Sequence, residues 1–168
     1  MIWVIVLAGG SGVRLAHEAR RQYGYARPKQ FCDFDGRGTL LAQTLERARR
    51  LTSDPHILVV TVRAHRHEAN EALAAFAEVR RLELPANRDT TSGIAVPLRF
   101  ILDRDPEAEV VVMPSDHAIS NRALFTGTVF EALAVVRREP DRMALLGAPP
   151  SGYDDGVGWL VPESNATP

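Results

Sequence analysis

The chain has 168 residues, 45% of them hydrophobic, and its 20 basic and 21 acidic residues leave a net charge of −1. A chain of this length can bury roughly 70% of the surface that its unfolded form exposes, which is enough for one domain. The charge balance excludes a broad basic face for nucleic acid or an anionic membrane, because such partners need clustered, unopposed Lys and Arg. Any anion site must therefore be local.

The cysteine count, the first apolar segment and the lysine count give three further expectations. A single cysteine, Cys32, excludes an internal disulfide framework and fits a reducing compartment, so we expect a cytoplasmic protein. The apolar start at 2–8 lacks a basic leader and is shorter than the roughly 18 residues of a spanning helix, which predicts neither a signal peptide nor an anchor. Nineteen basic residues are Arg and only Lys29 is Lys, so either Lys29 is needed as a compact point charge or it is retained by chance.

Strands and helices are predicted to alternate along the chain. Short apolar runs rich in β-branched residues predict strands covered on both faces, at 2–8, 57–62, 109–113 and 143–147. Helical patterns occur at 39–51, 65–78, 91–104 and 121–138, and Pro97 predicts a kink or a late start in the third. The alternation predicts a doubly wound α/β fold, with a mostly parallel sheet and helices on both faces. The last segment is typical of a turn followed by a strand at 157–161, whose uncovered apolar edge would favour a homo-oligomer.

The stretch LAGGSGVRL, residues 7–15, follows the first predicted strand and contains three glycines. It lies where doubly wound folds bind ligands, and glycines let backbone N–H groups converge on an anion. It has neither the G-K-[ST] of a P-loop nor the third glycine of a dinucleotide fingerprint, so a tight turn would explain the glycines equally well. Arg14, two residues past the last glycine, and the cluster Arg27-Pro28-Lys29 add cations that favour a phosphate site.

Asp116 follows the predicted strand at 109–113, at the same edge of the sheet. Mg²⁺ prefers one or two carboxylates together with phosphate oxygens, which suits a single Asp beside a nucleotide. A turn or helix-cap aspartate is the competing interpretation.

Five stretches in this order, LAGGSGVRL, RPKQF, LPANRDTTSGIA, VVVMPSDHAI and LGAPPSGYDDGVGWL, resemble the sugar-phosphate nucleotidyltransferases. The PKQF form is similar to the mannose-1-phosphate guanylyltransferase branch of that family. The resemblance implies a Rossmann-like nucleotide-diphospho-sugar transferase fold. It also implies transfer of GMP from GTP to mannose-1-phosphate, with release of pyrophosphate and with Mg²⁺ as cofactor. Such chemistry depends mainly on positioning and charge neutralisation.

The resemblance also assigns roles to residues of this chain. Arg14 would hold the β- and γ-phosphates and Lys29 would offset charge near the α-phosphate, which makes both catalytic, while Asp116 would bind the metal. Asn87, Arg88 and Thr90 would read the base, although a helix cap by Asp89 or Thr90 also fits that loop. The full nucleotide set is Leu7, Ala8, Gly9, Gly10, Gly12, Arg14, Lys29, Pro85, Asn87, Arg88, Thr90 and Asp116, and the sugar set is Gly156, Gly158 and Trp159.

Several positions depart from the family pattern. Arg14 and Pro28 are further apart than usual, and an acidic Asp89 stands where asparagine or glycine is typical. Family chains also continue further and supply a lysine for the sugar phosphate and a second metal-binding aspartate. We therefore expect residues 1–168 to form a single nucleotidyltransferase domain that is incomplete at its C-terminus.

Two other functions stay open. The cytidylyltransferases of isoprenoid synthesis share the glycine-rich opening and PKQ, but they carry D-A-A-R-P where this chain has PSDHAI. The chain would otherwise be a non-catalytic domain that binds nucleotide or pairs with another subunit.

Overall fold

The computed structural model describes residues 1–12, 15–149, 152 and 158–161. The chain divides into two compact units, residues 1–126 and residues 127–168. The first unit holds the sheet, and the second holds most of α5 (Arg122–Arg138) and the segment that follows it. Among the described residues, no helix has the length and apolar character needed to cross a membrane.

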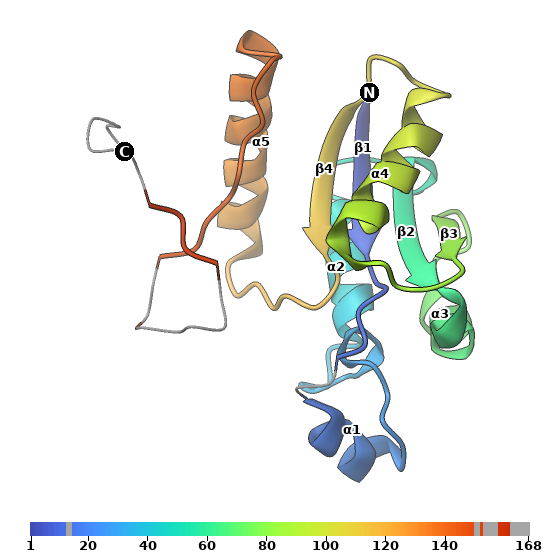
Figure 1. Ribbon diagram of the computed structural model, residues 1–168. Helices are drawn as coiled ribbons and strands as arrows, with labels where there is room; N and C mark the ends of the chain where they lie inside the picture. The colour runs from blue at the N-terminus through green and yellow to red at the C-terminus, as the bar shows by residue number, and fades with distance from the viewer. Residues whose placement is uncertain (13–14, 150–151, 153–157, 162–168) are drawn as a thin grey trace. The chain divides into compact units, whose positions relative to one another are not determined.

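Four parallel strands form the sheet of the first unit, in the order β3-β2-β1-β4 (Figure 1). Their bounds are β1 (Ile2–Leu7), β2 (Ile57–Val62), β3 (Arg80–Leu84) and β4 (Glu109–Pro114). In chain order, β2 pairs with one side of β1 and β3 pairs with β2. The last strand, β4, pairs with the other side of β1. At the carboxyl edge Leu7 is in register with Val60 on one side and with Pro114 on the other. This reversal creates the crevice in which doubly wound sheets bind ligands.

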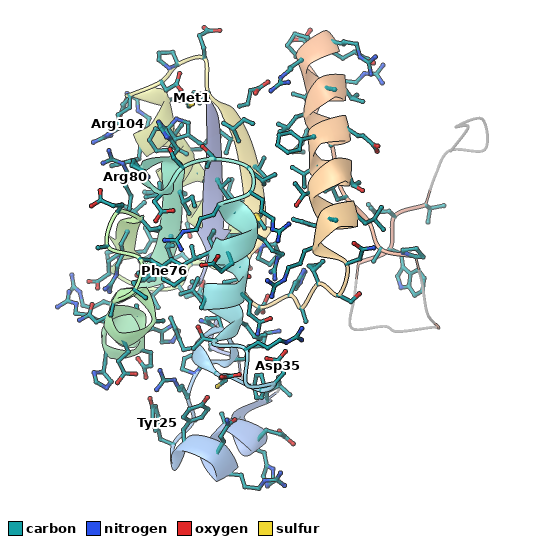
Figure 2. The ribbon with its side chains drawn as sticks, turned by 180° about the vertical axis from the view of Figure 1, so that it is seen from behind. Met1, Tyr25, Asp35, Phe76, Arg80 and Arg104 are labelled. Atoms are coloured by element: carbon teal, nitrogen blue, oxygen red, sulfur yellow. The ribbon has the colours of Figure 1, made fainter. Side chains whose placement is uncertain are left out.

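Helices cover both faces of the sheet, as predicted (Figures 1 and 2). The helix α4 (Asp89–Leu102) packs on one face, and α2 (Leu40–Ala48) packs against β1 on the other, next to α3 (Arg66–Leu73). Because side chains alternate along a strand, β1 supplies both layers. Its residues Trp3 and Ile5 join a buried cluster with Leu58, Val60 and Ile101, while Val4 and Val6 are buried toward the opposite face.

Short elements complete the first unit. The helix α1 (Ala16–Tyr23) lies beyond the carboxyl edge of the sheet (Figure 1). Gly24 ends it in the left-handed region, at φ 79°, and its N–H donates to the Arg20 carbonyl at 2.9 Å. The 3-10 helices η2 (Lys29–Phe31), η3 (Asp54–His56) and η4 (Arg63–His65) lie in the loops of this unit.

The structure confirms the predicted strands β1, β2 and β4 and adds two elements that the sequence patterns missed, β3 and α1. The sequence of β3, RRLEL, has no continuous apolar run, because three of its five residues are charged, and its Glu83 forms ion pairs with Arg66 and Arg81. Of the two alternatives predicted at Pro97, the late start is wrong, since α4 begins at Asp89 and contains Pro97.

The strand predicted at 143–147 is also wrong. No strand forms there, and Met143 and Leu145 are 82% and 65% exposed. A strand needs a partner for its backbone groups, and among the described residues none pairs with this run. The described part of the second predicted run, 158–161, also forms no strand.

Neighbouring residues at the end of α4 test the core. Ile101 is fully buried in the cluster with Trp3 and Ile5, whereas Leu102 is 43% exposed. We expect Ile101→Ala to lower the free energy of unfolding by about 2–5 kcal/mol in urea denaturation, because it leaves a cavity. The control Leu102→Ala should cost less than about 1 kcal/mol, because nearly half of that residue is already in contact with water. Equal losses would mean that α4 does not pack as described.

Candidate functional site

An open cavity of about 290 Å³ lies at the carboxyl edge of the sheet. All four strand ends contribute to it, together with the beginning of α4. The lining residues are Leu7, Gly9, Gly10, Gln30, Val60, Thr61, Val62, Leu84, Asn87, Asp89, Thr90, Gly93, Pro114, Ser115 and Asp116. The cavity therefore joins segments that are more than a hundred residues apart in the chain.

Gln30 holds the glycine-rich loop that follows β1. Its side chain is 2% exposed, and its Nε2 donates to the carbonyls of Ala8 at 3.1 Å and of Gly10 at 2.8 Å. A buried amide that satisfies two backbone acceptors fixes the path of the chain on both sides of Gly9. The RPKQF segment thus supports the loop directly.

Gly12 brings the same two segments into closest contact. Its φ is +64°, which is unfavourable for residues with a Cβ, and a Cβ placed there would lie 2.7 Å from the Lys29 backbone nitrogen. Glycine is therefore required at this position on two independent grounds. Gly10, by contrast, has open space around its Cβ position.

A charge pair crosses the site between η2 and the end of β4. Lys29 Nζ lies 2.7 Å from Asp116 Oδ2, and each side chain is about one-third exposed. His117 Nε2 is 3.9 Å from the other carboxylate oxygen of Asp116. Among the described residues no three His, Cys, Asp or Glu gather into a metal cluster. Asp116 fits a Mg²⁺ ion that draws its remaining ligands from a bound phosphate and from water, which is how Mg²⁺ commonly binds.

The loop before α4 is shaped by Asp89. Its φ is +67°, a conformation that Asn, Asp and Gly tolerate best, which explains the asparagine or glycine typical of the family at this position. The Asp89 N–H donates to Asn87 Oδ1 at 3.0 Å, and the Asp89 carboxylate accepts the Thr90 N–H at 2.8 Å. Neither bond caps α4, because its N-cap residue is Arg88 and no side chain makes a capping bond there, so the predicted cap by Asp89 or Thr90 is wrong. Asn87, Asp89 and Thr90 all line the cavity.

The structure brings most of the predicted nucleotide residues together. Six of them line the cavity: Leu7, Gly9, Gly10, Asn87, Thr90 and Asp116. Gly12 and Lys29 adjoin it through the contacts above, and Ala8 is buried beneath the loop. Pro85 and Arg88 are exposed and are not part of the lining.

Other predicted residues are not placed in this site. Arg14 and Gly156 lie outside the described residues. Gly158 and Trp159 are exposed and belong to the second unit. Their roles toward phosphate and sugar stay predictions.

Sequence reasoning missed several lining residues. Gln30 stands inside the RPKQF motif, but only the three-dimensional arrangement shows that its amide serves the loop after β1. Leu84 was missed because β3 was not predicted. Gly93 was missed because no local pattern shows that this residue of α4 faces Leu7, whose Cδ2 would lie 3.6 Å from a Cβ placed on Gly93.

Comparison with known proteins agrees with this architecture. A family model described as the MobA-like NTP transferase domain matches residues 4–149, and the chain belongs to this family. The alginate biosynthesis protein AlgA of Pseudomonas fluorescens is 33% identical over 158 residues, which cover 93% of this chain and 31% of that protein. Mannose-1-phosphate guanylyltransferase 2 of Escherichia coli O157:H7 is 30% identical over 166 residues, covering 95% of this chain and 32% of that protein. The chain therefore spans about a third of the length of these relatives.

Solved structures share the fold. A protein from Thermus thermophilus, described as a mannose-1-phosphate geranyltransferase, superposes with a TM-score of 0.65 at 28% identity. That match covers 80% of this chain and 38% of the other. A mannose-6-phosphate isomerase from Helicobacter pylori matches with a TM-score of 0.61 at 21% identity, which shows likeness of fold alone. These matches confirm the predicted nucleotidyltransferase-like α/β fold.

Paired glycine substitutions test the close approach of the loop to η2. We expect Gly12→Ala to lower the free energy of unfolding by at least about 1–2 kcal/mol, because a Cβ is strained at positive φ, and by more where Lys29 must move. Gly10→Ala should cost less than about 1 kcal/mol, since its Cβ meets nothing within 4 Å. Urea denaturation measures both, and a Gly12→Ala protein as stable as Gly10→Ala would contradict the described contact.

A glutamine pair tests the support of the loop. Gln30→Glu keeps the shape of the side chain but faces two carbonyl oxygens with a carboxylate, so we expect a loss of about 1–3 kcal/mol in unfolding free energy. The matched control is Gln22→Glu, which removes one exposed bond, from Nε2 to the Asp33 carbonyl. That change should cost less than about 1 kcal/mol. If the two variants unfold at the same urea concentration, Gln30 does not hold the loop.

Proposed function

We propose that this chain carries the nucleotide site of a mannose-1-phosphate guanylyltransferase, which transfers GMP from GTP to mannose-1-phosphate. The observation that carries the proposal is the 2.7 Å pair between Lys29 and Asp116 at the rim of the cavity. Two motifs distant in sequence thereby meet at the glycine-rich loop, each with the charge that a metal-bound triphosphate requires. The named relatives, a mannose-1-phosphate guanylyltransferase among them, support the choice of substrates.

In this proposal a phosphate oxygen of mannose-1-phosphate attacks the α-phosphorus of GTP. The new bond joins that oxygen to the α-phosphorus, and the bond from the α-phosphorus to the bridging oxygen breaks as pyrophosphate leaves. The chain supplies no covalent nucleophile to this step, so its residues act by binding and orienting. Mg²⁺, when bound, would neutralise charge on the triphosphate, and Asp116 would hold it.

Each part of the site then has a defined task. The backbone around Gly9 and Gly10 lies against the phosphates, where the absence of side chains allows close approach. Lys29 exchanges its partner Asp116 for a phosphate oxygen and offsets charge near the α-phosphate. Asn87 and Thr90, which also line the cavity, contact the base. Arg14, from its position after the loop, would bind the outer phosphates.

Calorimetric titration with GTP and MgCl₂ tests this proposal. We expect Lys29→Met and Asp116→Asn each to weaken binding roughly 10- to 100-fold, because each change removes a charge-assisted contact of about 1.5–3 kcal/mol. Arg99→Gln is the charge-matched control for Lys29→Met, and Asp103→Asn is the control for Asp116→Asn, since Arg99 and Asp103 pair with each other near the far end of α4. Neither control should change the affinity. Unaltered affinity in both site variants would overturn the proposal.

The same preparation separates the alternatives. Tighter binding of CTP than of GTP would favour the cytidylyltransferase interpretation. Pyrophosphate release from GTP and mannose-1-phosphate would exclude a non-catalytic domain.

A further inference from the structure

Arg47 is a buried cation that the proposed chemistry does not use. It lies in α2 and is 2% exposed, and the neighbouring Thr44, one turn earlier, is fully buried. Among the described residues no carboxylate pairs with Arg47, and its buried Nε has no hydrogen-bond partner. Arg49 of the same helix behaves in the usual way, since it pairs at the surface with Glu46 and Asp54. Burying a guanidinium without a counter-ion is costly, so its retention calls for a specific gain.

The donors of Arg47 point to the segment after β4. Its Nη2 donates to the carbonyl of His117 at 2.8 Å and to Thr44 Oγ1 at 2.6 Å. The Thr44 hydroxyl in turn lies 2.9 Å from the Leu40 carbonyl and 3.4 Å from the Ser115 carbonyl. Arg47 and Thr44 thus contact the backbone on both sides of Asp116, one residue before it and one residue after it.

The electrostatic surroundings of Arg47 also argue against a purely space-filling role for this residue. Burial lowers the pKa of the Arg47 guanidinium, and the positive charge of Arg122 lowers it further. An apolar side chain of similar length would fill the same volume without these penalties. A charge-assisted bond to a carbonyl, by contrast, is roughly twice as strong as a neutral one and has a fixed direction.

We infer that Arg47 is a positioning residue, which together with Thr44 holds the 115–117 backbone so that the Asp116 carboxylate stays beside Lys29 at the cavity. The inference rests on the role proposed above for Asp116 in nucleotide binding. The Ser115 N–H completes the arrangement, because it donates to the Leu7 carbonyl at 3.1 Å. The segment is therefore fixed to β1 on one side and to α2 on the other.

Amide hydrogen exchange in the nucleotide-free chain tests the positioning directly. Arg47→Met keeps the length of the side chain and removes its donors, so we expect the Ser115 amide to exchange roughly 10- to 100-fold faster relative to the amides of β2. The control Leu45→Ala removes a buried side chain of the same helix with no bond to 115–117. It should speed exchange across the first unit without singling out Ser115. An unchanged relative rate at Ser115 in Arg47→Met would overturn the inference.

A double-mutant cycle on Mg²⁺-dependent GTP binding then separates positioning from general stability. We expect Arg47→Met to weaken binding roughly tenfold in the otherwise unaltered chain and to have no further effect in an Asp116→Asn background. Equal losses in both backgrounds would show that Arg47 acts through the whole fold, and the inference would fall. If the unaltered chain binds no GTP, the proposed function fails, while the exchange rates still decide whether Arg47 holds the segment.

Thr44→Val provides a second variant should Arg47→Met not fold. It removes the hydroxyl that accepts from Arg47 and contacts the Ser115 carbonyl. It should change the Ser115 exchange rate and the Mg²⁺-dependent affinity in the same direction by a smaller factor. No change in either quantity would contradict the inference.

Discussion

Parallel pairing of β1 with both β2 and β4 is the constraint on which the rest of the structure depends. Together with the parallel pairing of β2 and β3, it places the carboxyl ends of all four strands at one edge, and the reversal of strand order beside β1 opens the crevice there. This edge brings together the glycine-rich loop, the PSDH segment at 114–117 and the beginning of α4, although they are far apart in the sequence. The chemistry of the site therefore depends on the residues that stand at the end of each strand.

Two kinds of contact turn this convergence into a defined site. The first is close packing of two backbone segments, because Gly12 lies so near the Lys29 backbone nitrogen that no residue with a Cβ fits. The second is hydrogen bonding from buried side chains to backbone carbonyls. Gln30 donates to the loop after β1, and Arg47 donates to the segment after β4. Each lies outside the set of residues expected to touch a nucleotide. The precision of the site therefore depends on a supporting layer whose polar groups are directed at the main chain.

The sequence predicted this site unevenly, for physical reasons. Continuous apolar runs predict the strands β1, β2 and β4. No such run marks β3, whose Glu83 forms ion pairs with Arg66 and Arg81. The run at 143–147 has the right composition but no partner among the described residues, which no local pattern can reveal. Motif order placed Lys29 and Asp116 in one site. Nothing in α2 distinguished Arg47 from a surface arginine, because burial of a helix position depends on what packs against it.

The position of β4 in the sheet has a consequence for local unfolding. In the sheet that the structure describes, β4 pairs with β1 alone, while β1 and β2 are each flanked on both sides. An opening that detaches β4 would leave β1, β2 and β3 paired yet carry Ser115 and Asp116 away from the cavity. Such an opening would disrupt the site while the other three strands stay paired. Whatever binds there and contacts both halves would stabilise the edge strand, linking occupancy to the order of β4.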